Sequence, residues 1–282
     1  IQKVKGEELT RMKEVNMITA LAGKAAGVQI NKNSSGIGGS AKVSLRGIRS
    51  ASGDNQPLYV IDGVPMLNIG TEQAYSAIGG TANAGNRDGG DGISNLNPED
   101  VESISILKGA PAAALYGSQA ANGVILITTK KGNTAGQRNI YFSTGLTFDK
   151  AFSLPKMQNC YGVSDVVDSW GEKAYLPTSN ELNDFFRTGL TSITSVSVNY
   201  GNEKIQTYFS YANTTGRGIV DKNQLTKHNI NLRETAVMFN QRLKLDGNVN
   251  VMRQIVKNKP VSGGFYMNPL VGLYRFPRGE DL

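Results

Sequence analysis

The sequence predicts a small α+β domain over residues 1–132, followed by strands of an antiparallel transmembrane β-barrel over residues 140–282. The first part carries short helical signals between strand signals, together with two long loops. The second part carries strands of about ten residues in which apolar and polar side chains alternate, a length that crosses a bilayer at a tilt. Residues 133–139 are expected to link the two parts.

Residues 97–132 carry the strongest local signals. Asn97 is a typical helix N-cap, and Pro98 follows at the first helical position, where proline is favoured. A strand comes next, and a second short helix is expected over residues 111–116. The β-branched run 123–130 predicts a strand that is buried on both faces.

Short elements are also expected upstream. Residues 1–6 resemble a strand, and the apolar residues spaced along 17–25 indicate a helix. Residues 42–49 alternate like a strand. Residues 57–66 predict two strands, joined by a tight turn at the Asp-Gly pair between them.

Two long loops interrupt this domain, at residues 31–40 and 67–96. Both are rich in small and polar residues, so neither can form a packed core, and the first is expected to be flexible. Loops of this length inside a compact domain are usually functional or mobile. We therefore regard both as candidate binding segments.

From residue 139 onward the pattern is one of two-faced strands, the first of which has Ile140, Phe142, Leu146 and Phe148 on one face. The expected connections are long at 150–191, short at 201–204, longer at 212–226, short at 235–241 and long from 253. A soluble sandwich has no reason to alternate its connections in this way. Short and long connections do alternate in membrane barrels, whose apolar face meets lipid.

Composition excludes several classes of function. The formal net charge is +7, but Lys and Arg are scattered, which argues against nucleic-acid binding. The sequence has one Cys and one His, so neither a disulfide nor a zinc site is expected. The Gly-rich runs lack the context of a phosphate-binding loop, and no Ser–His–Asp set can be argued. We therefore expect no enzyme.

The segment from Ile104 to Lys130 closely resembles the end of the plug domain of TonB-dependent outer-membrane transporters, whose motif is a variant of I-x-VLRGPxxxLYGSxAxxGVIxIxTK. Residues 20–30, 45–50 and 57–65 resemble the SusC/RagA family, the nutrient importers of the Bacteroidota. The resemblance implies that residues 1–132 are a plug and that the barrel has about 22 strands. The residues after the plug suffice for roughly five or six strands, so we expect a partial chain.

The resemblance also implies site residues. In the family, arginines in two plug segments face carboxylates of the barrel wall and help to fix the plug. Arg46 matches the first, and Lys108 occupies the second, where the planar fork of arginine is missing. These two form the expected plug–barrel lock. The expected ligand-facing residues of the plug loops are Asn33, Ser34, Asn86, Arg87, Asp88 and Asp91.

No cofactor is implied, apart from a candidate Ca²⁺ site to which Asp88 and Asp91 could contribute. The function implied is energy-coupled import of oligosaccharides or peptides across the cell outer membrane. The implied partners are TonB, a SusD-like surface lipoprotein and outer-membrane lipid, in a dimer of transporter–lipoprotein pairs. The TonB box itself is not identifiable. The alternative is a ligand-sensing or signalling receptor, or a surface interaction protein, of the same fold.

Overall fold

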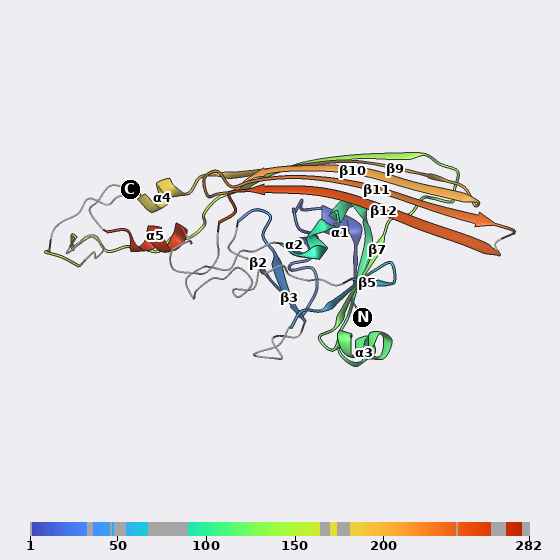
Figure 1. Ribbon diagram of the computed structural model, residues 1–282, viewed down its shortest axis with the longest axis horizontal. Coiled ribbons are helices and arrows are strands. Elements are labelled where there is room, and N and C mark those ends of the chain that lie inside the picture. The colour runs from blue at the N-terminus through green and yellow to red at the C-terminus, as the bar shows by residue number, and fades with distance from the viewer. Residues whose placement is uncertain are drawn as a thin grey trace, which may run out of the picture.

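The computed structural model describes residues 2–32, 36–45, 47, 55–66, 90–163, 170–173, 181–240, 242–260 and 269–277. Within these residues the chain forms two five-stranded sheets and one two-stranded pair. Figure 1 shows the second sheet as a long, gently curved arch, with the elements of the first sheet beneath its concave side. None of the helices in this part of the chain has the length and apolar composition that a membrane span requires.

The first sheet has the strand order β1-β6-β7-β4-β5. β6 pairs antiparallel with both β1 and β7, β7 pairs in parallel with β4, and β4 turns back into β5. The strands are β1 (Gln2–Lys5), β4 (Leu58–Ile61), β5 (Val64–Met66), β6 (Val101–Leu107) and β7 (Val124–Thr129). β2 (Val28–Lys32) and β3 (Ala41–Leu45) form the separate pair. We call the elements from β1 to β7 the N-terminal unit.

Several short helices complete this unit: α1 (Gly6–Thr10), α2 (Met17–Ala20), α3 (Ala110–Tyr116) and the 3₁₀ turns η1 (Gly92–Asn95), η2 (Pro98–Asp100) and η3 (Gly117–Ala120). The helix expected after Asn97 is only the single turn η2, because β6 begins directly behind it. Asn97 still caps that turn, since its Oδ1 accepts a hydrogen bond from the Glu99 N–H at 3.2 Å. The tight turn expected between β4 and β5 is confirmed: Asp62 and Gly63 have φ of 48° and 88°.

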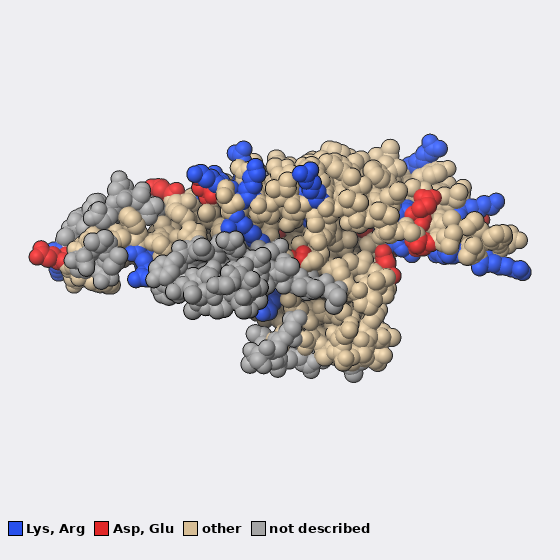
Figure 2. All heavy atoms as spheres, viewed as in Figure 1, with Lys and Arg blue, Asp and Glu red and all other residues tan. Residues whose placement is uncertain are grey.

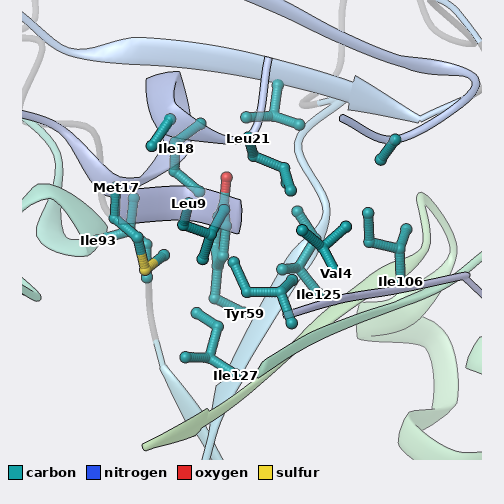
Figure 3. Packing of buried hydrophobic residues seen from close by; sticks show 14 of the residues in the cluster. Val4, Leu9, Met17, Ile18, Leu21, Tyr59, Ile93, Ile106, Ile125 and Ile127 are labelled. Carbon is teal, nitrogen blue, oxygen red and sulfur yellow. The ribbon is translucent and has the colours of Figure 1, made fainter. Parts of the chain in front are cut away.

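The core of the N-terminal unit lies between the first sheet and the short helices α1 and α2. In Figure 3, Ile125 and Ile127 from the sheet point towards Leu9 of α1. The apolar residues expected to form a helix over 17–25 are buried, but α2 covers only the first four positions and turns hold the rest. Burying each aliphatic side chain contributes about 1.5–3 kcal/mol, so this core fixes the sheet that carries the site.

The second sheet is a simple antiparallel meander, which we call the strand wall. Its strands are β8 (Asn139–Asp149), β9 (Gly189–Gly201), β10 (Ile205–Arg217), β11 (Gln224–Met238) and β12 (Leu243–Lys257). α4 (Glu181–Phe185) and α5 (Pro269–Arg275) lie beyond one end of the wall (Figure 1). The connections are residues 150–188 and 218–223 at that end, and 202–204 and 239–242 at the other. The alternation is as expected, but β10 and β11 are longer than expected, which shortens the connection predicted over 212–226.

The outer, convex face of the wall carries a band of apolar residues. The register places Ile140, Val198, Phe209, Leu232 and Val249 in one row across it, and Phe142, Val196, Tyr211, Ile230 and Val251 in the next. We call these two rows the apolar belt. Phe142 is 71% exposed, so these side chains point away from the protein. Beside the belt, the Glu234 carboxylate accepts a hydrogen bond from Thr207 Oγ1 at 2.7 Å.

Part of the first predicted loop is fixed against the wall. β2 extends into it as far as Lys32, and the Ile37 N–H donates to Asn223 Oδ1 at 3.1 Å. Lys259 Nζ donates to the Gly38 carbonyl at 3.2 Å. The expectation of a flexible loop is therefore wrong for residues 36–40, because their backbone groups find partners in the wall.

Candidate functional site: the interface between the N-terminal unit and the strand wall

The inner, concave face of the wall is polar and lies against the N-terminal unit. Its buried polar side chains are Thr191, Ser195, Ser210, Thr214, Lys227, Asn229, Asn231, Arg233 and Thr235. The first sheet meets this face through one edge. Because β4 and β7 are parallel, they finish on the same side, and antiparallel β6 starts there. That topology gathers Asp62, Thr129 and Asp100 opposite the wall.

Arg233 of β11 joins the two parts through ionic contacts. Its Nη1 donates to Asp62 Oδ2 at 2.9 Å and to Thr129 Oγ1 at 2.6 Å. Its Nε and Nη2 donate to the two oxygens of Asp246 on β12, both at 2.9 Å, in the bidentate geometry that favours arginine. The Arg233 side chain is only 5% exposed. Lys131 Nζ, 3.5 Å from Asp246 Oδ2, supplies the second positive charge that balances the two carboxylates.

Asp100 forms a second contact, which is fully buried. Its Oδ1 accepts hydrogen bonds from Tyr208 Oη at 2.9 Å and from Ser210 Oγ at 2.6 Å, both on β10. Burial raises the pKa of the Asp100 carboxyl above its ordinary range, and the two hydrogen bonds oppose that rise. Asp100 Oδ2, Asn231 Oδ1 and Thr235 Oγ1 have no hydrogen-bond partner among the described residues. The polar interface is therefore incompletely satisfied at this point.

β11 also holds the backbone of the N-terminal unit. Lys227 Nζ donates to the Ser94 carbonyl at 2.5 Å, and Asn229 Nδ2 donates to the Asn95 carbonyl at 2.8 Å. On the β8 side, the Lys13 ammonium contacts both Glu99 and Ser143. Burial lowers the pKa of the Lys13 ammonium.

The chain passes from one sheet to the other through a close joint. Asn199 of β9 accepts from the Asn133 N–H at 2.6 Å and donates to the Lys131 carbonyl at 3.2 Å. A Cβ on Gly132 would lie 2.3 Å from the Thr207 backbone nitrogen. Only glycine allows β10 to approach so closely.

A cavity of about 400 Å³ lies where the N-terminal unit meets the wall end that carries the longer connections. The unit contributes Glu14, Lys32 and the turn at residues 36–40, and the wall contributes Asp149 and Lys150. Lys32 Nζ lies 3.1 Å from Glu14 Oε2. The volume falls within the range of small-molecule sites. Charges of both signs suit a polar ligand.

The structure places two of the site residues expected from the sequence. The Lys108 ammonium donates to the Ala26 carbonyl, inside the N-terminal unit. Asp91 is buried, and its carboxylate accepts from the Ser94 and Ala41 N–H groups at 2.9 and 2.8 Å, so it holds the backbone beneath the cavity. Arg46, Asn33, Ser34, Asn86, Arg87 and Asp88 lie outside the described residues. The predicted lock and the ligand-facing residues remain predictions.

Reasoning from the sequence missed the residues that make the observed contacts. Asp62 was interpreted only as a turn residue and Asp100 only as a helix-start acid. The available signal was the alternation of side chains along the strand. Arg233 lies between outward-facing Leu232 and Glu234, so it points inward, where a charge needs a partner. Within the described parts of the chain, no cluster of His, Cys, Asp and Glu could hold a metal ion. The Ca²⁺ prediction, which depends on Asp88, also remains a prediction.

Comparison with known proteins agrees with this architecture. Residues 1–124 match the TonB-dependent Receptor Plug Domain family. The chain is similar to TonB-dependent receptor SusC of Bacteroides thetaiotaomicron, with 32% identity over 89% of this chain and 24% of that protein. It is also similar to TonB-dependent receptor P26 of Formosa agariphila, with 29% identity over 74% of this chain and 20% of that protein.

Among solved structures, the RagAB peptide importer in its closed-closed state shares the fold. The TM-score is 0.70 at 21% identity, over 91% of this chain and 31% of that one. The chain thus spans about a quarter of the length of SusC and less than a third of the matched RagAB chain. The plug match, the SusC relationship and the shared fold together place it in a family: the chain belongs to the TonB-dependent receptors of the SusC/RagA type and is a partial chain, with the plug domain and antiparallel strands of the barrel.

Proposed function

We propose that the protein containing this chain is an energy-coupled importer of the outer membrane, with the N-terminal unit as its plug and the strand wall as the first barrel strands. One observation carries the proposal: Arg233 ties a plug carboxylate to a wall whose opposite face is apolar and exposed. A wall of this kind suits lipid outside and a polar lumen inside. The boundaries remain those expected from the sequence, with the plug over 1–132, a linker over 133–139 and strands from 140.

The chemistry of the interface suits a plug that must move. An apolar interface would expose hydrocarbon to water on opening, at a cost of about 25 cal/mol per Å². Polar groups such as Asn229, Ser210 and Asp100 can exchange their partners for water instead. Pulling by TonB would then have to overcome chiefly the buried ionic contacts of Arg233. Arg46 and Lys108 belong to this proposal as further lock residues.

The cavity beside residues 36–40 is the proposed entry of the ligand path. The connection 150–188 would face the cell exterior, because long connections of outer-membrane barrels are extracellular. The ligand is an oligosaccharide or a peptide; RagAB is described as a peptide importer. The proposed partners are TonB and a SusD-like lipoprotein lid, in a dimer of such pairs.

The test is uptake of labelled oligosaccharides and peptides by cells that carry the full-length receptor. Removing TonB should abolish uptake, and removing the partner lipoprotein should reduce it strongly. Binding at the cell surface should persist without TonB, which separates recognition from transport. Uptake at an unchanged rate in cells without TonB would refute the proposal. Ligand-dependent gene induction without uptake would support the sensing alternative.

The proposed lock has its own test. Replacing Arg46 by Ala should increase passive entry of small antibiotics into whole cells, because the plug would be held less firmly. Lys108→Ala should have a smaller effect, since the Lys108 ammonium already has a partner within the N-terminal unit. Unchanged entry in the Arg46 variant would count against its locking role.

A further inference from the structure

Three cations stand on the convex face of the wall, beyond the apolar belt. Arg217, Arg253 and Lys257 are all exposed, and all point to the side away from the N-terminal unit. They therefore cannot line the cavity or contact the plug. Figure 2 shows Lys and Arg side chains over the part of the convex side nearer α4.

The level of these cations relative to the apolar surface follows from the register. On β9 to β12 the continuous outward apolar residues end together at the row of Val196, Tyr211, Ile230 and Val251, whereas on β8 they continue to Phe148. Beyond that row, Leu190 of β9 and Ile255 of β12 are further exposed apolar residues. The pairing sets 140–148 of β8 level with 249–257 of β12. The upper border of the apolar belt is thus level across β9 to β12, and the next outward row holds Thr194, Asn213, His228 and Arg253.

The three cations lie at two levels beyond the apolar belt. Arg253 stands in the first row beyond it, because it pairs through His228 with Asn213. Arg217 lies four residues beyond Asn213 on β10, about 13 Å along the strand, and is level with Lys257 on β12.

None of the three has a carboxylate partner in the described part of the chain. Asp221, in the connection beside Arg217, is engaged by Arg187. His228, which pairs with Arg253, hydrogen-bonds with Tyr211 Oη at 3.0 Å and is not acidic. Among the described residues, the three cations therefore form an uncompensated positive surface beyond the apolar belt.

We propose that Arg217, Arg253 and Lys257 bind the phosphate groups of lipid headgroups in the outer leaflet. A phosphate-bearing amphiphile matches both features at once: acyl chains against the apolar belt and a dianionic or monoanionic group at the cations. Arginine is suited to this role because its fork binds phosphate oxygens in pairs. The inference rests on the proposed outer-membrane placement and adds a headgroup preference to it.

The test uses the full-length receptor in nanodiscs made from phosphatidylcholine with either monophosphorylated or dephosphorylated lipid A. These two probes differ in one phosphate and share their acyl chains. Native mass spectrometry after release into detergent counts the retained lipid A. The wild-type receptor should retain the phosphorylated form preferentially, and the triple variant R217Q/R253Q/K257Q should lose that preference, by about fivefold per cation removed.

The matched control is K204Q/R242Q, which removes two exposed cations from the short turns at the opposite end of the wall. It should retain the wild-type preference. A third disc containing phosphatidylglycerol separates lipid A from a glycerophospholipid source, and stronger retention of phosphatidylglycerol would overturn the outer-leaflet assignment. Equal retention of both lipid A forms by the wild type, or an unchanged preference in the triple variant, would overturn the proposal. Failure of all variants to enter discs would refute membrane placement instead.

Discussion

Arg233 shows how one side chain can join two separate parts of a chain. Its five donors are enough to satisfy Asp62 of the plug and Asp246 of the neighbouring strand together. The charges are placed the other way round from the lock expected from the family, in which a cation of the plug contacts carboxylates of the wall. A wall cation is buried by the plug, and two carboxylates keep it there.

Replacing Arg233 by Ala should destabilise the docked plug by about 3–5 kcal/mol, because it leaves two carboxylates without their buried partner. The measurement is the unfolding midpoint of the full-length receptor in detergent, combined with passive antibiotic entry in cells. Arg242→Ala, at an exposed turn, is the matched control and should be neutral. If Asp62→Asn relieved none of the loss in the Arg233 variant, the pair would not be coupled.

Asp100 gives the interface a dependence on pH. Since burial raises its pKa in the folded protein, the folded state keeps this proton at pH values where the unfolded chain, with a pKa of about 3.9, has released it. The contribution of Asp100 to stability therefore falls as pH rises from the ordinary carboxyl pKa through the raised one.

The variant Asp100→Asn should remove that fall. Its unfolding midpoint should change less between acidic and neutral pH than that of the wild type, with Glu203→Gln at an exposed turn as the control. An identical pH profile for the wild type and the Asn variant would show that Asp100 does not titrate in this range.

At the scale of single residues, the sequence predicted conformations better than contacts. The left-handed turn at Asp62 follows from the Asp-Gly pair itself. Its ion pair does not, because Arg233 lies 171 positions further along the chain. The Lys108 ammonium donates to the Ala26 carbonyl, a contact that the sequence does not indicate, and its role in the lock stays a prediction.

Among the elements, the turn at residues 36–40 departs most from the sequence prediction. Its glycines indicated a flexible loop, and no neighbouring residue in the sequence indicates that the wall supplies hydrogen-bond partners for its backbone. Asn223, fully buried, accepts from the Ile37 N–H and donates to the Lys257 and Asn258 carbonyls. One amide thus connects the plug turn, the connection 218–223 and the end of β12.

Asn223→Ala should release this turn without unfolding the receptor. Loss of its hydrogen bonds is expected to cost about 1–3 kcal/mol locally and to increase proteolytic cleavage within residues 36–40. Ligand affinity should fall as well, because the turn lines the cavity. Asn250→Ala, on the exposed inner face of β12, is the control. Equal cleavage in the two variants would mean that Asn223 does not hold the turn.

The strands themselves were largely predictable. The alternation of apolar and polar residues identified β8 to β12, because one face of each strand is apolar. The pattern remains visible although the N-terminal unit covers the other face, since that inner face is polar. The length of the 3₁₀ turn at 98–100 was not predictable. The cap signal at Asn97 indicates where a helix begins, but its end depends on where the following β-branched strand begins.

For the whole molecule, the decisive feature is the joint between the two sheets. Gly132 lies where β10 passes, and the wall backbone fills the space that any side chain there would need. The plug is thus attached covalently at a place where it packs closely against the wall.

Gly132→Ala should disturb plug docking, with a destabilisation of about 1–3 kcal/mol from overpacking and increased passive entry. Gly247→Ala is a closely matched control, since a Cβ there meets nothing within 4 Å. Thermal unfolding in detergent and antibiotic entry provide the two readouts. If both substitutions had the same effect, the close approach of β10 to Gly132 would make no contribution to stability.

The order of strands in the first sheet has a mechanical consequence. In the described part of the chain, β1 forms one edge and pairs with β6 over four residues, whereas Asp62 follows β4 near the opposite edge. A pulling force on the N-terminal end of the chain would first break the hydrogen bonds between β1 and β6 one after another. Only then would the force reach the Arg233 guanidinium near the opposite edge of the sheet. The plug would therefore yield in stages, with a weak rupture preceding a strong one.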